Sequence, residues 1–507
     1  MILRSVCIFY FTSLLWPILT AQNEHVKHDY QWLIGYNRFL DSTYYNGILF
    51  DFHGDSLMLF QEPMEAQFNI SSVSMADKDG NLVFSSNNDV VMNGNNEIMV
   101  NGDSLNANAS YVVDFVQQSQ LALPAPGSDS LYYLFHQEYT FVGYIEGDYV
   151  LFVVPFKLLW SRIDTGYDSA DSVEGAVVDK NTVLVEDTLM AGRLTAVRHG
   201  NGRDWWMIAQ KFNSNQYYTV LIDPQGVHDP SIQTTGYFPV MGGHSAVGQA
   251  VFSPDGNTYA VLRGHSIDQD RQIDVFDIDR CTGELFNPIR VNIPSGGFSG
   301  GLAYSSNSRY LYYSEAAGYY RIDTHQDSLT LEFLQPRIDT VKFGFQAQLG
   351  PDGKIYYALG LGSTRHYAVI DNPDEENPDS VVIRQQGLEL PYLNNGTIPH
   401  HPNYRLGRLA GSPCDTLTFP TDVVEVAPEA ELPDIHIAPN PARAEITITG
   451  LPEKEVELTL VDVSGRERLH ARVRGPEAQL DVQGLPAGVY VVRVAGRKPG
   501  RVVVVRE

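Results

Sequence analysis

VFSPDGNTYAVL, residues 251–262, is the stretch that decides the fold of this chain. Pro254 presets the backbone for the first corner of a turn, and Asp255, Gly256 and Asn257 tolerate the corner geometry that follows. The residues on either side are β-branched, aromatic or aliphatic, which suits a pleated, half-buried surface. The stretch therefore predicts two short antiparallel strands joined by a tight turn.

Five further stretches repeat this pattern of strand, turn and strand. Their turns centre on Asp79, Asp129, Gly202, Asn307 and Asp352. With the turn at Asp255 included, successive turns lie 50, 73, 53, 52 and 45 residues apart, by subtraction of their numbers. Units of about 40–50 residues that each hold short strands and turns are typical of β-propeller blades. The one long interval predicts an insertion, which residues 141–159 and 164–174 would supply.

Six turns predict six blades, and the segments left over predict a seventh. Residues 30–61 hold two or three strands before the first repeat, and residues 394–407 follow the last one. If these two segments share one sheet, the ring closes and two exposed sheet edges disappear. We therefore expect an all-β, seven-bladed β-propeller over residues 30–408. Six or eight blades, or an irregular β-sandwich, are the alternatives.

The N-terminus predicts export. Residues 1–21 hold Arg4 near the start, an apolar run over residues 6–19, and the small residues Thr20 and Ala21 as a cleavage site, the pattern of a secretory signal peptide. A buried first strand or a retained anchor is the alternative. Cleavage would leave two cysteines, Cys281 and Cys414, which an oxidising compartment allows to pair. The sequence leaves a disulfide and two free thiols equally open.

The formal net charge is −26, and it is unevenly distributed. From Asp434 onward the chain is nearly balanced, with 11 Lys and Arg against 10 Asp and Glu, so the acidic excess precedes it. Such a body argues against a nucleic-acid partner, because phosphates demand Lys and Arg. It is compatible with a solvated surface or with cation binding.

A change of composition marks a second domain. Residues 409–433 alternate prolines with acidic residues, which predicts a stiff, extended linker. Residues 434–507 alternate apolar and polar residues between Gly and Pro turns. This pattern predicts a small immunoglobulin-like β-sandwich of about seven short strands.

The C-terminal domain resembles the sorting domain of the bacterial type IX secretion system. The resemblance rests on PNP at residues 439–441, VDVSGR at 461–466, GLPAGVYVVRV at 484–494 and GRVVVVRE at 500–507. It implies a Bacteroidetes-type cell, the type IX machinery as a partner, and a secreted protein, released or anchored at the outer-membrane surface after export. The residues that carry the motif are Pro439, Asn440, Pro441, Gly465, Gly484, Gly488 and Tyr490.

The body resembles WD40- or YVTN-like propeller proteins of the same bacteria. The matching segments are residues 32–35, 79–87, 91–102, 131–135, 276–285 and 404–417. The departures are Ser-Ser-Asn at 85–87, where the family has FYT-type residues, and the insertion near Phe141. The resemblance implies architecture and surface location, and it supplies no catalytic residues.

Two motifs resemble parts of metal-binding sites, but a hairpin turn is favoured for the first and a structural or surface role for the second. Residues 77–81, DKDGN, resemble half of a calcium loop, but Leu82 occupies the position that demands glycine, so a plain hairpin turn is favoured. His400 and His401 point to opposite faces of an extended segment and cannot chelate one metal well, which favours a structural or surface role. We expect no cofactor, with calcium as the alternative.

One class of residue could line a functional site. The innermost strands of a propeller surround a central channel, and polar residues there suit water or a ligand. These strands begin just upstream of each turn, so the candidates are Gln120, Arg193, His244, Gln249, Gln346 and Gln348. A hydrated channel without a ligand is the alternative.

Two functions follow. The first is a binding or scaffold protein, without catalysis, that presents one face to a surface glycan, peptide or partner protein. The second is an extracellular hydrolase or lyase that acts on polysaccharide or peptide, with two carboxylates roughly 5–10 Å apart at the channel mouth. Contact with a membrane is expected only through anchoring after export.

Overall fold

The computed structural model describes residues 25–36, 43–64, 66–68, 70–106, 116–142, 152–168, 173–238, 248–263, 271–293, 299–338, 340–360, 364–417, 435–462, 466–494, 497 and 500–506. Within them every regular element is a β-strand, apart from a 3-10 turn at Pro378–Ser380, which confirms the all-β prediction. No helix among them is long and apolar enough to cross a membrane. The expected signal peptide, residues 1–21, lies outside the described residues, as do residues 418–433 of the expected linker.

The chain divides into two compact units, Met1–Thr416 and Leu417–Glu507. In its described part the larger unit holds seven antiparallel sheets, numbered here in chain order. Sheet 1 contains β1 (Gln31–Gly35), β2 (Gly47–Asp51) and β3 (Met58–Glu62). Sheet 2 contains β4 (Val73–Ala76), β5 (Leu82–Ser86) and β6 (Val91–Asn93). Sheet 3 contains β7 (Gln120–Pro124), β8 (Leu131–Val142), β9 (Phe152–Asp168) and β10 (Glu174–Glu186). Sheet 4 contains β11 (Thr195–Arg198), β12 (Trp205–Gln210), β13 (Gln216–Asp223), β14 (Gly226–Val227) and β15 (Ser231–Thr234). Sheet 5 contains β16 (Ala250–Phe252), β17 (Thr258–Arg263), β18 (Arg271–Asp279) and β19 (Glu284–Ile293). Sheet 6 contains β20 (Ser299–Tyr304), β21 (Tyr310–Glu315), β22 (Gly318–Asp323) and β23 (Glu332–Pro336). Sheet 7 contains β24 (Gly344–Leu349), β25 (Ile355–Leu359), β26 (Thr364–Ile370) and β27 (Ile383–Asn394).

All six predicted hairpins are present. Each predicted turn lies between the first two paired strands of sheets 2–7. In sheet 5 the Ser253 amide donates to the Thr258 carbonyl at 2.9 Å, and the Gly256 amide donates to the Ser253 carbonyl at 2.8 Å. Gly256 has φ +73°, a left-handed conformation that glycine adopts without strain. The local turn chemistry therefore accounts for these strand pairs.

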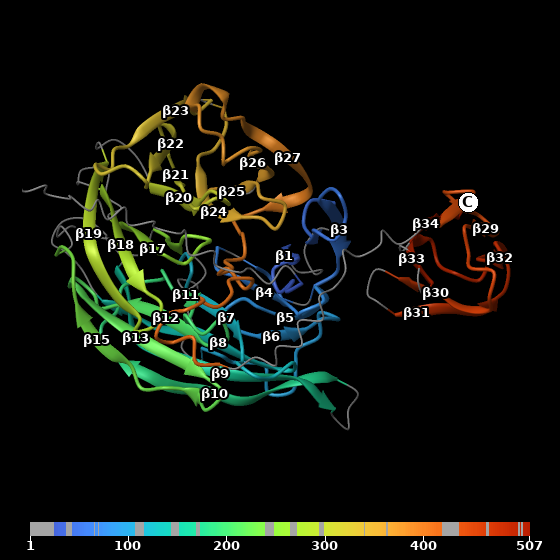
Figure 1. The fold of residues 1–507 in the computed structure, drawn as a ribbon, viewed down its shortest axis with the longest axis horizontal. Helices are drawn as coiled ribbons and strands as arrows, with labels where there is room; N and C mark the ends of the chain where they lie inside the picture. The colour runs from blue at the N-terminus through green and yellow to red at the C-terminus, as the bar shows by residue number, and fades with distance from the viewer. Residues whose placement is uncertain are drawn as a thin grey trace, which may run out of the picture. The chain divides into compact units, whose positions relative to one another are not determined.

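Apolar side chains join neighbouring sheets. One cluster spans sheets 2, 3 and 4, and others join sheet 4 to 5, 5 to 6, and 6 to 7. Sheet 1 packs on sheet 2 through Leu33 and Met92, and on sheet 7 through Trp32 and Tyr356. The sheets therefore surround a common centre (Figure 1), and the larger unit has a β-propeller fold.

The ring does not close by the strand pairing that the sequence suggested. In the described part of the chain, sheet 1 contains β1, β2 and β3, and residues 395–405 hold no strand. Pro399 and Pro402 fall in this segment, and each removes an amide that a sheet ladder needs. His401 still stacks on Trp32 of β1, with ring centroids 6.0 Å apart, so the last segment lies beside the first sheet without pairing with it.

The long interval between repeats takes the form of extended strands. β8, β9 and β10 have 12, 17 and 13 residues, whereas the first two strands of sheet 2 have four and five. The three strands pair along their length and reach past the other sheets in Figure 1. Residues 143–151 lie outside the described part of this predicted insertion.

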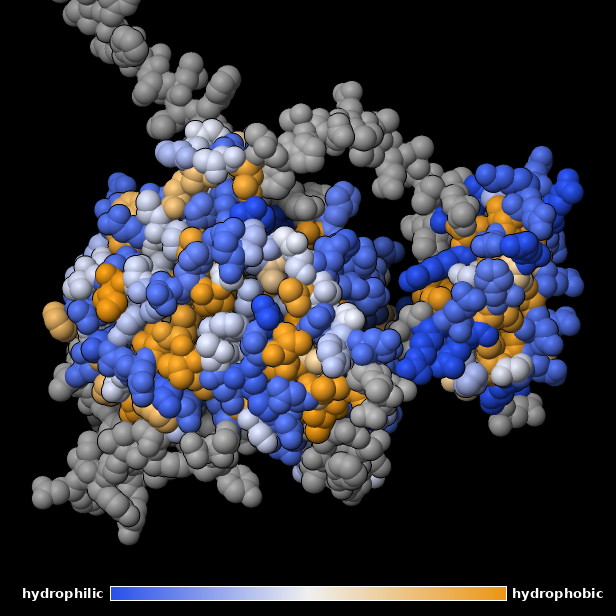
Figure 2. Space-filling model, turned by 90° about the horizontal axis from the view of Figure 1, so that it is seen from below, coloured by the Kyte–Doolittle hydropathy of each residue, from blue (hydrophilic) through white to orange (hydrophobic). Residues whose placement is uncertain are grey.

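Hydrophilic residues cover much of the larger unit on the face shown in Figure 2, and hydrophobic residues form separate patches there. Exposed apolar side chains occur on outer strands, including Val178 and Val183 of β10 and Ile232 of β15. The outer strands of a blade face solvent, so scattered apolar residues on them need no partner.

The smaller unit consists of two sheets around one core. One sheet has β28 (His436–Ala438), β29 (Glu445–Thr449) and β32 (Glu477–Asp481). The other has β31 (Glu467–Val473), β30 (Val456–Asp462), β33 (Gly488–Val494) and β34 (Gly500–Val504). Ile446, Leu458, Val492 and Val502 are among the residues that fill the space between them.

The turn of sheet 5 offers a test of how the last segment packs on the ring. A Cβ at Gly256 would lie 2.4 Å from Cδ2 of Leu406, whereas a Cβ at Gly353, in the equivalent turn of sheet 7 with φ +77°, would meet nothing closer than Ser306 Oγ at 3.8 Å. Each of the substitutions Gly256→Ala and Gly353→Ala should lower the free energy of unfolding by about 1 kcal/mol, because alanine is strained in this left-handed conformation. Gly256→Ala should lose more, because Leu406 must move. Urea unfolding measures both, and equal losses would contradict this packing.

Candidate functional site

Residues 395–408, called the strap here, run inside the ring of sheets, where they are drawn in orange (Figure 1). The Tyr404 hydroxyl donates to the Ala122 carbonyl of sheet 3 at 3.1 Å, and Nδ2 of Asn403 donates to the Pro254 carbonyl of sheet 5 at 2.6 Å. Its contacts thus reach sheets that lie far apart in the sequence. The strap reaches the hairpin turn of sheet 5 at Asn403 and Leu406, whereas His400 contacts Thr195 at the start of β11, the end of that strand away from its turn.

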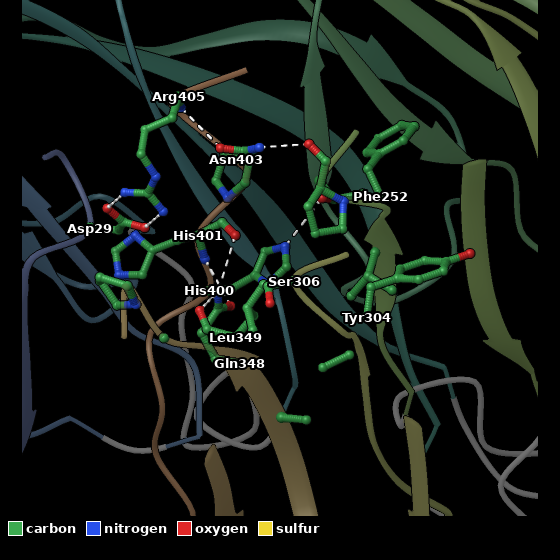
Figure 3. A pocket seen from close by; sticks show the side chains of 18 of the residues that line it. Asp29, Phe252, Tyr304, Ser306, Gln348, Leu349, His400, His401, Asn403 and Arg405 are labelled. Carbon is green, nitrogen blue, oxygen red and sulfur yellow. Dashed lines mark hydrogen bonds and ion pairs between the residues drawn. The ribbon is translucent and has the colours of Figure 1, made fainter. Parts of the chain in front are cut away.

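A cavity of about 210 Å³ lies between the strap and sheets 5, 6 and 7 (Figure 3). Half-buried or exposed residues form its rim, among them Pro254, Ser306 and Asn403. Buried residues lie deeper, among them Thr195, Gln348, His400 and His401. The cavity therefore has an accessible rim and an interior that is partly polar and partly apolar, with Val251, Ala303 and Ala347 among its buried apolar residues, and small-ligand sites have this form.

His400 is fixed by sheets 3 and 4. Its Nδ1 lies 2.8 Å from Nε2 of Gln118, and its Nε2 lies 3.2 Å from Oγ1 of Thr195. Because Gln118 supplies an N–H, Nδ1 is the acceptor and Nε2 carries the proton. Burial lowers the pKa of His400 to about 3, and repulsion from His401 adds to the shift. His400 is therefore neutral, and both of its nitrogens are used within the protein.

His401 lies beside it and has a different environment. Its ring stacks on Trp32 and meets Tyr404 edge-on, each at a centroid distance of 6.0 Å. Neither ring nitrogen has a hydrogen-bond partner among the described residues, although the side chain is only 6% exposed. Burial lowers the pKa of His401 to about 4; the Asp29 carboxylate opposes this shift, whereas Arg405 and His28 reinforce it.

Asp29 and Arg405 form a bidentate ion pair at one side of the cavity, with contacts of 2.6 and 2.8 Å (Figure 3). Burial by itself raises the pKa of Asp29, but the charge and hydrogen bonds of Arg405 outweigh it, so the pKa lies below its ordinary value. Asp29 is the single carboxylate among the described residues that line the cavity. The pair thus leaves the cavity without an uncompensated charge.

The side-chain amides that line the cavity are also hydrogen-bonded within the protein. Nε2 of Gln348 donates to the His401 carbonyl at 3.2 Å, and its Oε1 accepts from the His401 amide at 3.1 Å. Oδ1 of Asn403 accepts from the Arg405 amide at 3.0 Å. These side chains hold the strap in place.

The channel residues that the sequence singled out have similar roles. Gln120, Arg193, Gln249, Gln346 and Gln348 are all buried, and Gln348 alone of these five lines the cavity. Gln249 bonds to Leu302 and Ala347, which joins sheet 5 to sheets 6 and 7, and Nε of Arg193 donates to the Leu262 carbonyl at 3.1 Å. His244 lies outside the described residues. Sequence reasoning missed Asp29, Asn403 and Arg405, and it favoured a structural or surface role for His400 and His401.

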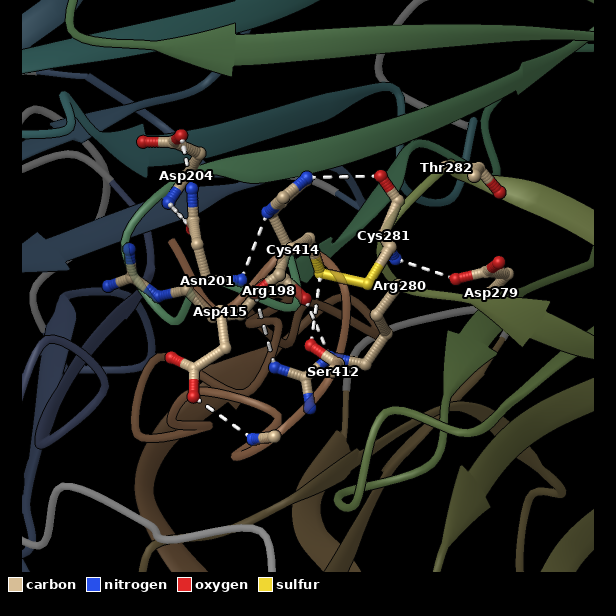
Figure 4. Close-up of a disulfide and its surroundings, with 12 residues drawn as sticks. Arg198, Asn201, Asp204, Asp279, Arg280, Cys281, Thr282, Ser412, Cys414 and Asp415 are labelled. Carbon is tan, nitrogen blue, oxygen red and sulfur yellow. Dashed lines mark hydrogen bonds between the residues drawn. A yellow bond between two sulfur atoms is a disulfide. The ribbon is translucent and has the colours of Figure 1, made fainter. Parts of the chain in front are cut away.

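A disulfide joins Cys281 to Cys414, with Cα atoms 5.4 Å apart (Figure 4). Cys281 lies in the turn between β18 and β19, and Cys414 follows the strap. Hydrogen bonds surround the link: the Leu409 amide donates to the Gly200 carbonyl at 2.7 Å, and Arg280 donates to the Gly407 carbonyl at 2.6 Å. Of the two alternatives that the sequence left open, the structure has the disulfide, which ties the end of the strap to sheet 5.

The acidic turn at residues 77–81 is bonded within itself. Oδ1 of Asp77 accepts from the amides of Asp79 and Asn81, both at 2.9 Å. Among the described residues no group of three His, Cys, Asp or Glu could hold a metal ion.

The sorting-motif residues hold the smaller unit together where it is described. Nδ2 of Asn440 donates to the Arg501 carbonyl and its Oδ1 accepts from the Val503 amide, both at 2.9 Å. The Tyr490 hydroxyl donates to the Pro486 carbonyl at 2.8 Å. Cis peptide bonds precede Pro439 and Pro441, which lie on either side of Asn440. Gly488 begins β33, Gly484 lies in the turn before it, and Gly465 lies outside the described residues.

Comparison with known proteins identifies this unit. Residues 436–504 match the family described as "Secretion system C-terminal sorting domain". They are a type IX secretion sorting domain, so the protein is exported and is extracellular or attached to the outer-membrane surface. No curated relative matches the chain.

Solved structures similar to the chain overlap with it loosely. A putative 6-phosphogluconolactonase from Bacteroides uniformis is 14% identical, with 72% of this chain and 97% of that chain covered and a TM-score of 0.38. The periplasmic gluconolactonase of Pseudomonas aeruginosa is 12% identical, with 72% and 97% covered and a TM-score of 0.38. The β-propeller domain of Cps50 (Swd1) from Myceliophteria thermophila is 10% identical, with 66% and 94% covered and a TM-score of 0.37. Overlaps this low carry no functional argument.

The buried histidines predict a pH-dependent stability. Their folded pKa values, about 3 for His400 and about 4 for His401, lie below the ordinary value of 6.5, so between these limits the unfolded chain binds protons that the folded protein does not. Stability is therefore complete above about pH 6.5 and falls as the pH drops, by at most about 1.4 kcal/mol per pH unit for each histidine.

Urea unfolding at pH 7 and pH 5 measures this effect, because Asp29, with its lowered pKa, stays ionised over that interval. A His400→Phe, His401→Phe double variant should show a smaller difference between the two pH values. Equal midpoints for the unsubstituted protein at pH 7 and pH 5 would contradict the assignment.

Proposed function

We propose that this exported protein is a non-catalytic binding protein that holds its ligand in the strap cavity. We infer that the seven sheets are the blades of one seven-bladed propeller, because sheet 1 packs on both sheet 2 and sheet 7. We likewise infer that the two sheets of the smaller unit form an immunoglobulin-like sandwich around their shared core.

One observation carries the binding function: the cavity combines an open rim with a buried, partly polar interior that is already ordered. Preorganised polar groups bind a ligand with little further loss of freedom. The side chains of Gln348, His400 and Arg405 are each held by the protein itself before any ligand arrives. A surface glycan, a peptide or a partner protein could insert one residue into such a cavity.

The alternative of a hydrolase or lyase lacks a supporting observation. Its two-carboxylate mechanism needs a second acid near the first. Among the described residues of the cavity, the one carboxylate is that of Asp29, which is held in its charged form by Arg405. An ionised, fully paired carboxylate is a poor proton donor.

A cavity-blocking variant tests the binding function. Ser306 lies exposed on the rim, so Ser306→Trp should fill the cavity without disturbing the core. The exported protein, screened on a glycan array and by pull-down from the cell surface, should lose its ligand with this substitution. Gln326→Trp, at an exposed position of the same sheet outside the cavity, is the control. Ligand capture that is equal in all three proteins would place binding elsewhere.

Truncation tests the export route. Deletion of residues 484–507 removes β33 and β34, whose Val492 and Val502 belong to the core of the sorting domain, so the domain should not fold. The protein should then accumulate in the periplasm, as measured by fractionation and immunoblotting. Glu453→Gln, on an exposed loop of this domain, should leave surface display intact. Surface display of the truncated protein would contradict the proposal.

A further inference from the structure

The two outer faces of the sorting domain differ in charge and in hydropathy. Its core lies between the two sheets, so alternate residues of each strand point away from the core. On the three-stranded sheet the outward positions are almost all polar: His436, Ala438, Glu445, Thr447, Thr449, Glu477, Gln479 and Asp481. Three of them are acidic, and the described residues of these strands include no Lys or Arg. Such a face suits contact with water.

The outward positions of the four-stranded sheet are apolar along its middle. Val461 of β30 lies opposite Val491 of β33, and Val489 of β33 lies opposite Val503 of β34. Val489, Val491 and Val503 are half-buried, and none of these four valines belongs to the core between the sheets. Threonine occupies outward positions of β29, so a strand does not require valine there. A row of apolar residues on the outer side of one sheet, beside a polar outer side on the other, is typical of an interaction surface.

Positive charge borders this row of valines. Arg501 of β34 lies opposite Val491, and Arg493 lies two residues further along β33 on the same face. Both arginines are exposed, and β33 and β34 contain no Asp or Glu. On the edge strand β31, by contrast, Arg472 is neutralised by Glu457 at 3.0 Å. We call the surface made by the four valines, Arg493 and Arg501 the valine face.

Three of the four sequence stretches that resemble the sorting family meet on this face. Residues 461–466, 484–494 and 500–507 contribute to β30, β33 and β34, which are neighbours in the sheet. Inward residues of these stretches, such as Val492 and Val502, are explained by the core. The outward residues fill no place in the core, so the fold does not account for them. Residues of a family motif that do not serve the fold are candidates for recognition.

The free edge of β34 is closed to a partner strand. Asn440 donates to the Arg501 carbonyl and accepts from the Val503 amide, both at 2.9 Å. The Ala442 amide donates to the Val503 carbonyl at 2.7 Å, and the Ala442 carbonyl accepts from the Val505 amide at 2.9 Å. An edge whose backbone groups are already paired cannot extend the sheet. Recognition of β34 therefore has to involve the side chains of the valine face.

We propose that the valine face is the surface through which the sorting domain docks on the type IX secretion machinery. The partner surface that fits it is an apolar patch bordered by carboxylates, because the valines need apolar cover and Arg493 and Arg501 need opposite charges. The acidic face of the three-stranded sheet would repel such a partner and stays in water. This inference concerns the smaller unit and does not depend on the ligand proposed for the larger unit.

Charge reversal on each face tests this assignment in the full chain, produced in a bacterium that has a type IX system. Arg493→Glu combined with Arg501→Glu should lower the amount of protein at or beyond the cell surface roughly tenfold and raise the periplasmic amount, as measured by fractionation and immunoblotting. Glu445→Arg combined with Glu477→Arg is the matched control: it reverses as many charges on the other face and should leave export unchanged. Equal export of both double variants and the unsubstituted protein would overturn the proposal.

A second measurement remains decisive even if the arginine double variant fails to fold. A photo-crosslinking residue replaces Val489 on the valine face or Thr447 on the opposite face, and the cells are illuminated during export. The chain with the crosslinker at 489 should be joined to a protein that mass spectrometry identifies as a component of the type IX machinery, and the chain with it at 447 should not. Crosslinks to the machinery from position 447 alone, from both positions equally, or from neither would overturn the docking face.

These outcomes are separate from the export route itself. If deletion of residues 484–507 blocks export, but the reversal of Arg493 and Arg501 does not, the route stands and the valine face is not the docking surface. If the deletion leaves export unchanged, the proposed route and the docking surface both fail.

Discussion

The strap is the constraint on which the rest of the larger unit depends. It contains Pro399 and Pro402, so it cannot pair as a strand, and its polar groups must find partners elsewhere. They find them on sheets 3, 4, 5 and 7, through contacts such as those of Tyr404, His400, Asn403 and His401. One extended segment thus joins blades that lie far apart in the sequence. The disulfide that follows it closes a loop of 133 residues, a length for which chain entropy alone suggests about 4–5 kcal/mol of stabilisation.

The polar side chains at the centre of the ring also join one blade to another. The innermost strands present backbone groups that no further strand satisfies, and glutamine offers a donor and an acceptor on one flat amide. Gln249 bonds to Leu302 and Ala347, and Gln346 donates to the carbonyls of Ile70 and Gly396 at 2.7 and 2.8 Å. Polar residues at the centre of a propeller therefore need not mark a ligand site. Here they replace backbone hydrogen bonds between blades.

Much of the fold could be predicted because its signals are local. A Pro-Asp-Gly turn between β-branched strands specifies a hairpin wherever it occurs, and all six predicted hairpins are present. Ring closure could not be predicted, because it depends on contacts such as that between Tyr404 and Ala122, 282 residues apart. For the site, the reasoning that adjacent histidines face opposite sides was sound: His400 meets Gln118 and Thr195, whereas His401 meets Trp32. Sequence could not reveal which of the two would be left without a partner, because that depends on side chains from three different sheets.

The cavity and the strap form together. His400, His401, Asn403 and Arg405 all belong to the strap, so the cavity walls exist only when the strap is seated. Seating depends on the ion pair with Asp29 near the N-terminus of the ring and on the disulfide at the other end of the strap. A disulfide forms in an oxidising compartment and not in the cytosol. Because the signal peptide predicted for residues 1–21 would take the chain out of the cytosol, the first step of export and the completion of the cavity are linked. The ordered cavity is therefore a property of the exported protein, and the unexported chain would lack the covalent tie that holds His401 in place.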